Sequence, residues 1–506
     1  MIVLAAAAAA GAAVVALYLD GLAFELVGDD YQWVQHAHRA MHHPALLFSQ
    51  HGGFFRPAGT WTLVVDRLLW PWTPTGYHAS NLFLHLVAAA LLGGAAARLG
   101  VPPLGSVAVA AVWAMSPWAS ESALHPAVRF DTLLMIAWCC LLVVWPRHNE
   151  IWTGRRRLAA VGTLLLAAAS KETWVVTPGL VLVLELAQRR RRGVAALKPA
   201  ALVTAGGLVY SAAHVALLSL GRTYFTWEPG MFAKLPQQLA AFLLLAPHRP
   251  AGFEFTAAGV AALLPVAALF WWAWRTRSAV IWVGLALLLL PPLPTLATPV
   301  LPLRYAVVSF AGLVLAIAGA IVAAQRRLAG TWQTAGAVAA ALLAAAALGW
   351  GGSRVRLELE DARRVSDAHA RLLQQAAQVV RSLPEGVPVL VVSRGEASPL
   401  VEIAASPAGW RKPFFVRGDD PAGLVDSAAL LAWSRGAKEL DVAHIGDWGS
   451  RAARRPGRAL LYSAAGFTLL DAWIDDAGGE AQRLHEAGTP VRLVQVYRLR
   501  GMPGVN

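Results

Sequence analysis

The chain has 506 residues, of which 57% are hydrophobic and only 14% are charged. Soluble domains average about 25% charged residues, so this composition excludes an ordinary soluble protein and indicates a polytopic α-helical membrane protein with a smaller soluble part. The net charge of +13 is explained by arginine-rich loops that face anionic lipid, and nucleic-acid binding is not the expected function.

Eleven apolar segments are candidate membrane spans, because a crossing needs roughly 20 apolar residues. They cover residues 2–24, 79–97, 103–117, 130–146, 158–170, 173–188, 197–220, 256–274, 279–298, 305–323 and 331–350. The arginine clusters 155–157 and 189–192 fall in one set of connecting loops, and nearly all acids fall in the other. The positive-inside rule therefore predicts a cytoplasmic N-terminus and an extracytoplasmic C-terminus. Abundant Ala, Arg, Gly and Trp with little Lys is typical of a GC-rich bacterial genome, so we expect a bacterial inner-membrane protein. Segment 236–247 is too short for a span and is expected to form an outer interfacial or re-entrant helix.

The first outer loop, residues 25–78, is long and rich in aromatic residues. This pattern is typical of short helices that lie on the membrane surface, which we expect at 31–42 and 57–70. The adjacent acids Asp29 and Asp30 stand near the start of the loop. Neighbouring carboxylates can raise one another's pKa, so one of them can serve as a general base. The alternative is that Asp30 caps the following helix.

Polar residues follow in the same loop and in the second span. Arg56 is a candidate phosphate ligand. His78, Asn81 and His85 recur at spacings of three and four residues, which places them on one helical face. Such residues usually face protein or a cavity rather than lipid. The alternative for Asn81 and His85 is hydrogen bonding between helices.

Two more groups combine charge with a position at the outer ends of spans. Glu121 precedes Arg129 by eight residues and Asp131 by ten. Further along the chain, Arg304 and Tyr305 open the tenth predicted span from the outer side. Isolated cations here are candidate ligands of a phosphate, and the alternative is that they extend to lipid headgroups.

Lys171 and Glu172 lie in the middle of the apolar run 158–188. A single helix over this run would measure about 46 Å, which is too long for one crossing, so we expect a hairpin with the charged pair at its tip. Charge at that depth indicates a functional site. The alternative is a Lys–Glu pair that neutralises itself at the interface.

The composition changes after Gly351 and Gly352, so we expect a transmembrane domain over 1–352 and a soluble α/β domain over 353–506. Within the second domain an amphipathic helix is predicted at 354–382. Strands are predicted at 387–393, 458–464 and 491–499, and helices near 421–434 and 479–487.

Neither metal binding nor a disulfide is indicated. Cys139 and Cys140 are adjacent in an apolar run, where cysteine acts as a packing residue. His38 and His42 have helical spacing, but no third ligand is specified, so zinc is not expected and no cofactor is required.

Four ordered motifs resemble one family. The string FRPAGTWTLVVDRLLWPWTPTGYHASNLFLH is similar to the first-loop motif of the tetratricopeptide-repeat transmembrane O-mannosyltransferases, relatives of the dolichyl-phosphate-mannose protein mannosyltransferases. The family's later motifs match Pro117, Glu121, Arg129 and Asp131, then Ser170-Lys171-Glu172, then Arg304-Tyr305, where Leu303 replaces an acid. The resemblance covers about residues 20–325.

The resemblance implies the GT-C glycosyltransferase fold, a polyprenyl-phosphate-linked sugar donor and an active site on the outer face. It also implies that Asp29 or Asp30 is the catalytic base. The tail has no tetratricopeptide repeat, so the acceptor, a protein or a glycan, stays open.

We therefore expect an inverting hexosyltransferase that needs no metal, because cationic side chains can stabilise the leaving phosphate. The donor and its phosphate would contact Arg56, Arg129, Lys171, Arg304, Tyr305, His78 and Asn81, with Glu121, Asp131 and Glu172 orienting the cations or the sugar. The rival function is a transporter or flippase for a lipid-linked saccharide, which would place its polar site at the bilayer midplane. A third hypothesis, a membrane-anchored scaffold, leaves the ordered motifs unexplained.

Overall fold

A computed structural model of the protein describes most of the first 381 residues and five short strands beyond them. The described residues are 1–26, 29–49, 51, 54–71, 73–147, 150–188, 197–218, 232–243, 257–297, 306–381, 389–393, 439–443, 458–463, 466–473 and 496–500. The chain divides into two compact units, each built from several segments. The first unit comprises residues 1–19, 45–62 and 79–356, and the second comprises residues 20–44, 63–78 and 357–506.

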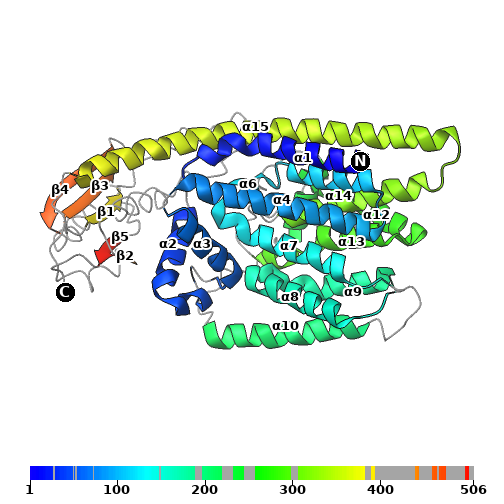
Figure 1. Ribbon diagram of the computed structural model, residues 1–506, viewed down its shortest axis with the longest axis horizontal. Helices are drawn as coiled ribbons and strands as arrows, with labels where there is room; N and C mark the ends of the chain where they lie inside the picture. Colours follow the sequence, from blue (N-terminus) through cyan, green and yellow to red (C-terminus); the bar gives the residue numbers. More distant parts are fainter. Residues whose placement is uncertain are drawn as a thin grey trace. The chain divides into compact units, whose positions relative to one another are not determined.

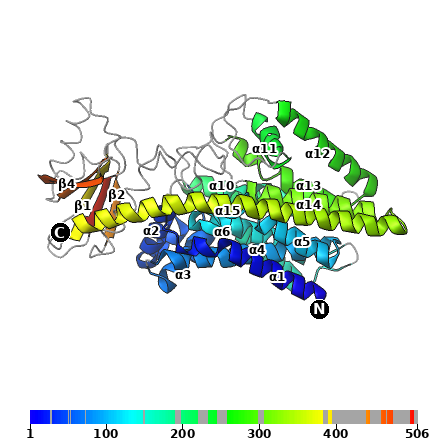
Figure 2. The same cartoon turned by 90° about the horizontal axis from the view of Figure 1, so that it is seen from above.

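Helices dominate the described residues. The helices are α1 Ile2–Tyr18, α2 Asp29–His42, α3 Pro57–Leu69, α4 Pro74–Leu99, α5 Pro103–Ala114, α6 Ser120–Leu124, α7 Arg129–Val144, α8 Gly154–Ser170, α9 Thr177–Gln188, α10 Leu197–Leu218, α11 Lys234–Leu243, α12 Ala257–Thr276, α13 Ala279–Leu289, α14 Ala306–Gln325 and α15 Thr331–Arg381. Short 3-10 turns include η1 Leu19–Ala23, η2 Pro44–Phe48, η3 Pro126–Val128, η4 Glu172–Val176 and η7 Leu293–Ala297. Figure 1 shows the long helices of the first unit running side by side, and in Figure 2 α12 runs obliquely to α13 and α14.

Six helical segments in the described part of the chain are long and apolar enough to cross a membrane. They are Ile2–Ala23, Pro74–Leu99, Pro126–Val144, Ala257–Thr276, Ala306–Gln325 and Thr331–Arg364. Apolar side chains on their surfaces are exposed, such as Trp274 on α12, which is 77% exposed, as expected of residues that face lipid. The chain is thus a multi-pass membrane protein. Helices are present at all eleven predicted positions, but only these six meet both criteria, so the count of eleven spans stays a prediction.

Helices α13 and α14 approach each other closely through glycine. A Cβ atom on Gly312 would lie 2.3 Å from the backbone nitrogen of Leu288, and one on Gly284 would lie 2.5 Å from the nitrogen of Ala316. Small residues permit such backbone contact, which is a common basis of helix association in membranes. This contact fixes α14 as a central element of the first unit.

Helix α15 continues without interruption across Gly351 and Gly352, where the sequence predicts an end to the last span and a new helix from 354. The reason is packing. A Cβ atom on Gly351 would lie 2.6 Å from the carbonyl oxygen of Met115, so this glycine permits a close approach instead of ending the helix.

Helix α11 covers most of segment 236–247. Every described side chain from Pro236 to Phe242 is buried. This burial shows that α11 packs against other parts of the chain, including α12; its position relative to the membrane, interfacial or re-entrant, stays a prediction.

In the second unit, five strands form two small sheets: β1 Val389–Ser393, β2 Glu439–Ala443, β3 Arg458–Ser463, β4 Gly466–Trp473 and β5 Val496–Arg500. β1 pairs in parallel with β3, which pairs antiparallel with β4, whereas β2 pairs antiparallel with β5. Strands β1, β3 and β5 overlap the three predicted strands, and β2 and β4 were not predicted. The helices predicted near 421–434 and 479–487 lie outside the described residues.

Candidate active site

A buried ion pair joins Lys171 to Asp131. The Lys171 Nζ donates to Asp131 Oδ1, and the two side chains are only 3% and 8% exposed. Helix α8 ends at Ser170, and Lys171 has an extended backbone (φ −159°, ψ 150°) before η4 begins. The predicted interruption of the long apolar run at Lys171 is therefore confirmed. Asp131 lies in the first turn of α7, where the helix dipole favours a negative charge.

The neighbouring Glu172 binds a different partner. Arg56 Nε donates to Glu172 Oε1 at 3.0 Å, and Arg56 Nη2 donates to Glu172 Oε2 at 2.9 Å, which is the bidentate geometry of a strong charge-assisted pair. Burial raises the pKa of Glu172, but the charge and hydrogen bonds of Arg56, a backbone hydrogen bond and the charge of Lys171 together lower this pKa below its usual value. Glu172 is therefore ionised at neutral pH.

These contacts exclude the alternative in which Lys171 and Glu172 neutralise each other. Each pairs instead with a residue that is distant in the sequence. The dipeptide thus links the start of α7, through Asp131, to the residue that precedes α3, Arg56.

Aromatic rings enclose the Arg56 guanidinium. Its Cζ lies 4.2 Å from the centre of the Phe54 ring and 4.9 Å from that of Phe130, within the range of cation–π attraction. The Phe130 ring also lies against Gly59, where an added Cβ would be only 2.0 Å from the ring. Glycine at this position therefore lets Phe130 and Arg56 take up their observed places.

Arg129 is held inside the first unit by Asn81. Its Nε donates to Asn81 Oδ1 at 2.8 Å, and both side chains are fully buried. In the sequence, Arg56, Arg129 and Lys171 are candidate phosphate ligands with acids expected to orient the cations or the sugar, and their role as ligands stays a prediction. The structure brings all three together with acceptors from other helices or loops, because an unpaired charge is costly away from water.

Glu121 and His85 are also buried in this unit. One ring nitrogen of His85 lies 3.0 Å from Ser122 Oγ, and the other lies 3.0 Å from the Ala114 carbonyl. The ring also stacks on Trp113, with centroids 4.8 Å apart. His85 therefore connects helices, which confirms the alternative considered for it.

The predicted acids Asp29 and Asp30 belong to the second unit. Helix α2 begins at Asp29, so Asp30 lies within the first helical turn and not at the capping position. The Asp30 side chain is fully buried, and that of Asp29 is outside the described part of the structure. Two hydrogen-bond contacts hold the segment that precedes these acids. His78 Nε2 lies 3.0 Å from the Phe24 carbonyl oxygen, and the backbone N–H of Glu25 donates to Ser366 Oγ at 2.8 Å.

The remaining predicted site residues are only partly described. Arg304 and Tyr305 lie outside the described residues.

The rings of His38 and His42 are 4.8 Å apart. Burial, and then the charges of Arg67 and His42, lower the pKa of His38 to about 4. Among the described residues, no group of three His, Cys, Asp or Glu side chains is placed to hold a metal ion.

Lys234 is a buried cation that the sequence analysis missed. It is 2% exposed, and its Nζ donates to the Leu296 carbonyl at 2.7 Å. Leu296 belongs to η7, which packs against η4, the turn that begins with Glu172. A lysine at the start of a largely apolar segment was the available signal.

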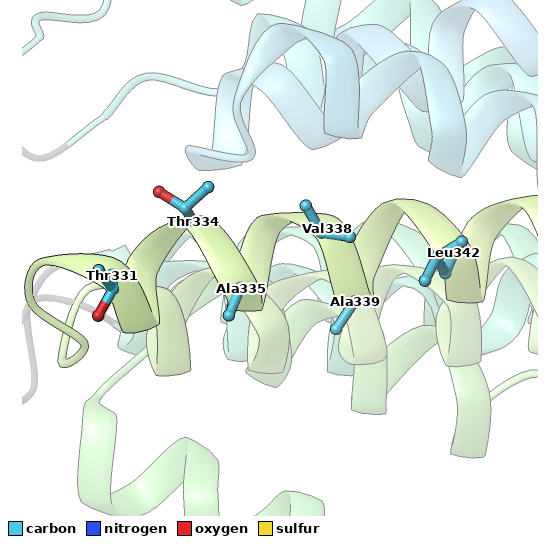
Figure 3. Close-up of a pocket in the computed structure, with 6 residues that line it drawn as sticks. All are labelled: Thr331, Thr334, Ala335, Val338, Ala339 and Leu342. Atoms are coloured by element: carbon cyan, nitrogen blue, oxygen red, sulfur yellow. The ribbon is translucent and has the colours of Figure 1, made fainter.

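A hollow of about 610 Å³ lies elsewhere, along the first turns of α15 (Figure 3). It is lined by Thr331, Thr334, Ala335, Val338, Ala339 and Leu342. All six belong to one helix and none carries a charge, so this hollow is not the candidate active site.

Comparison with known proteins gives a structural relationship only. No protein-family model and no curated protein matches the sequence. Two solved structures match over nearly the whole chain, both of ArnT from Cupriavidus metallidurans. The apo structure is 15% identical, covers 96% of each chain and has a TM-score of 0.51. The structure bound to undecaprenyl phosphate is 15% identical, covers 97% of each chain and has a TM-score of 0.50.

The chain has the fold of ArnT. ArnT is a GT-C glycosyltransferase, so the fold that the sequence motifs imply is confirmed at this level. The finer resemblance, to O-mannosyltransferases, stays a prediction.

Proposed function

We propose that this protein is a membrane glycosyltransferase that transfers a sugar from a polyprenyl-phosphate-linked donor to an acceptor hydroxyl on the extracytoplasmic face. The observation that carries the proposal is the network of Arg56, Glu172, Lys171 and Asp131 within a GT-C fold. It is supported by the ArnT structure with undecaprenyl phosphate bound. The sugar and the acceptor, a protein or a glycan, are not specified by these residues.

Sugar transfer needs a base and a stabilised leaving group. In the proposed reaction the acceptor oxygen attacks the anomeric carbon while the bond from that carbon to the phosphate oxygen breaks. Asp29 or Asp30 takes the hydroxyl proton, and the polyprenyl phosphate leaves with the electron pair of the broken bond. Attack from the opposite side of the ring inverts the anomeric configuration.

The cations would stabilise the phosphate as its charge increases. The Arg56 guanidinium is a cation whose orientation is set by hydrogen bonds from its Nε and Nη2 to Glu172. Glu172 and Asp131 hold Arg56 and Lys171 in place, and charge that is fixed in position before the reaction accounts for much of the rate enhancement of many enzymes. We assign Arg129, Asn81, Glu121, His78, Arg304 and Tyr305 to the substrate site as further parts of the proposal.

The proposal extends to the arrangement in the membrane. We propose eleven spans in the domain 1–352, an extracytoplasmic α/β domain over 353–506, and a bacterial inner-membrane location with the N-terminus in the cytoplasm. The arginine-rich loops would then face the cytoplasm.

The proposal is tested with purified protein in lipid nanodiscs. Undecaprenyl-phosphate sugars are supplied with a crude envelope extract as acceptor, and released undecaprenyl phosphate is measured. We expect release by the wild type, and its loss in Asp30→Asn or Asp29→Asn without loss of folding. Full activity of the double variant would remove the base assignment.

The same purified protein distinguishes the rival function, that of a flippase, from that of a transferase. A flippase moves the lipid-linked sugar between leaflets and leaves the sugar–phosphate bond intact. Movement of the labelled donor across a vesicle without release of undecaprenyl phosphate would favour it.

A further inference from the structure

Four aromatic rings cluster in the first unit around Trp118. Its ring centre lies 4.5 Å from that of Phe310, 5.4 Å from that of Phe242 and 5.6 Å from that of Trp350. The rings of Phe242 and Phe310 are 5.9 Å apart. We call Trp118, Phe242, Phe310 and Trp350 the aromatic cluster. It joins α11, α14 and α15 to the turn that precedes α6.

Three buried polar side chains that are close in sequence to residues of this cluster have no hydrogen-bond partner among the described residues. Within that part of the chain, neither the amide nitrogen nor the amide oxygen of Gln238 is bonded, although the residue is only 4% exposed. The hydroxyls of Ser116 and Ser309 likewise have no bond to a described residue, and both residues are buried. Gln238 precedes Phe242 by one helical turn, Ser309 adjoins Phe310, and Ser116 is two residues from Trp118.

An unbonded buried amide destabilises a protein, because the group has lost its hydrogen bonds to water. Native structures contain few such groups, and each requires an explanation. The two unbonded atoms of the Gln238 amide, one helical turn from Phe242, are explained if a ligand supplies the missing bonds. A glutamine amide offers two donors and one acceptor, which suits a ligand that carries hydroxyl groups.

The face of α11 connects this cluster to the ion-pair network. Lys234, Gln238 and Phe242 follow one another at intervals of four residues, so they lie along one side of the helix over about 12 Å. Lys234 donates to the Leu296 carbonyl of η7, and η7 packs against η4, the turn that begins with Glu172. Along α11 the order is therefore cation, amide, aromatic ring.

We propose that Gln238 is a specificity-determining residue that hydrogen-bonds a hydroxyl group of the sugar carried by the donor lipid, with the aromatic cluster against the apolar side of the sugar ring. In a glycosyl phosphate the ring and its hydroxyl groups lie on one side of the phosphate, and along α11 Gln238 and Phe242 lie on one side of Lys234. This inference rests on the proposed function and adds the residue that distinguishes one donor sugar from another. Sites of this kind combine aromatic walls with a few placed polar groups.

The test compares wild type with Gln238→Leu in nanodiscs by thermal unfolding. The probes are undecaprenyl phosphate and undecaprenyl phosphate carrying glucose, galactose, mannose or N-acetylglucosamine. Without any added undecaprenyl lipid, Gln238→Leu should be as stable as wild type or more stable, because an apolar side chain of similar size replaces the unbonded amide. Gln333→Leu, at an exposed position in α15, serves as the control.

We expect at least one sugar lipid to raise the unfolding temperature of wild type more than undecaprenyl phosphate does. Gln238→Leu should lose this additional rise. Its affinity for the sugar lipid should fall by about 5- to 100-fold, with its response to undecaprenyl phosphate and the control unchanged. The inference is overturned if Gln238→Leu keeps the additional stabilisation by the sugar lipid, or if no sugar lipid stabilises wild type more than undecaprenyl phosphate does. It is also overturned if Gln238→Leu is less stable than wild type when no undecaprenyl lipid is added. If undecaprenyl phosphate itself does not stabilise wild type, the proposed function fails as well.

Discussion

Lys171 and Asp131 are 40 residues apart in the sequence, yet their side chains form an almost fully buried ion pair. The pair places a cation and a carboxylate at the junction of η4 and α7. Removing one residue leaves the other buried without its ion-pair partner, whereas removing both leaves no charge of this pair. Comparing the stability of the double variant with its activity therefore distinguishes a purely structural pair from one that also serves the reaction.

Single substitutions in this pair should be strongly destabilising. Asp131→Leu or Lys171→Met should lower stability by about 3–5 kcal/mol, and the double variant should recover most of it. Thermal unfolding in nanodiscs measures both. Because Lys171 is proposed to bind the donor phosphate, the double variant should remain inactive in the undecaprenyl phosphate release assay. Recovery of activity together with stability would restrict the pair to a structural role.

The pair of Arg56 and Glu172 should make the protein sensitive to acid. The pKa of Glu172 is lowered in the folded state, so its stabilising contribution is complete above its ordinary pKa of about 4.5 and is lost as the pH falls below it. In Arg56→Gln, burial would raise the pKa of Glu172 in the folded state. Protonation of Glu172 would then favour folding, so the contribution of this residue to acid destabilisation should disappear or reverse. The measurement is the unfolding temperature from pH 7 to pH 3. Coincident pH profiles for the two proteins would contradict this expectation.

Gly59→Ala should disturb the site through Phe130. The new methyl group would meet the Phe130 ring at 2.0 Å, and the displaced ring would shift the Arg56 guanidinium that lies over it. We expect a loss of about 1–3 kcal/mol in stability and a lower rate of sugar transfer. Gly162→Ala in α8 is the matched control: no atom of the described residues lies within 4 Å of its Cβ position, so it should be neutral or slightly stabilising.

Glu150 should contribute to stability but not to the reaction. Hydrogen bonding from Arg98 is the largest cause that lowers its pKa to about 2, with Arg147 and Arg156 adding to it against the opposing effect of burial. Glu150→Gln should therefore unfold at a lower temperature at pH 7. The difference should shrink as the pH falls from 4.5 toward 2. Unchanged release of undecaprenyl phosphate by this variant would support its place outside the site, and Glu360→Gln, exposed on α15, is the control for the stability measurement.

The sequence predicted helices and their interruptions well where local pattern decides them. The helices at 29–42 and 57–69 and the break at Lys171 follow from aromatic content, length and charge. The continuity of α15 could not be predicted. Glycine usually favours a helix end, and only the contact of Gly351 with Met115 explains its presence inside a helix.

The composition of the candidate site was predictable, but its pairing was not. Arg56, Lys171, Glu172, Asp131 and Arg129 were selected as charged residues at the ends of apolar runs. Their partners depend on packing between segments far apart in the chain, on which periodicity carries no information. Lys234 and Gln238 were missed because the few polar residues of α11 match no catalytic or binding motif.

The central claim is that the acids and cations of the proposed site share the extracytoplasmic face, and cysteine labelling tests it most directly. In a chain with Cys139 and Cys140 replaced by alanine, single cysteines are placed at the exposed positions His43, Val175 and Ile151. Intact cells are treated with a membrane-impermeant maleimide. The account predicts that positions 43 and 175 react from outside and that position 151 reacts only after the membrane is opened. Labelling of 43 and 175 from opposite sides would contradict it, since Asp30 and Lys171 could then not act on one substrate.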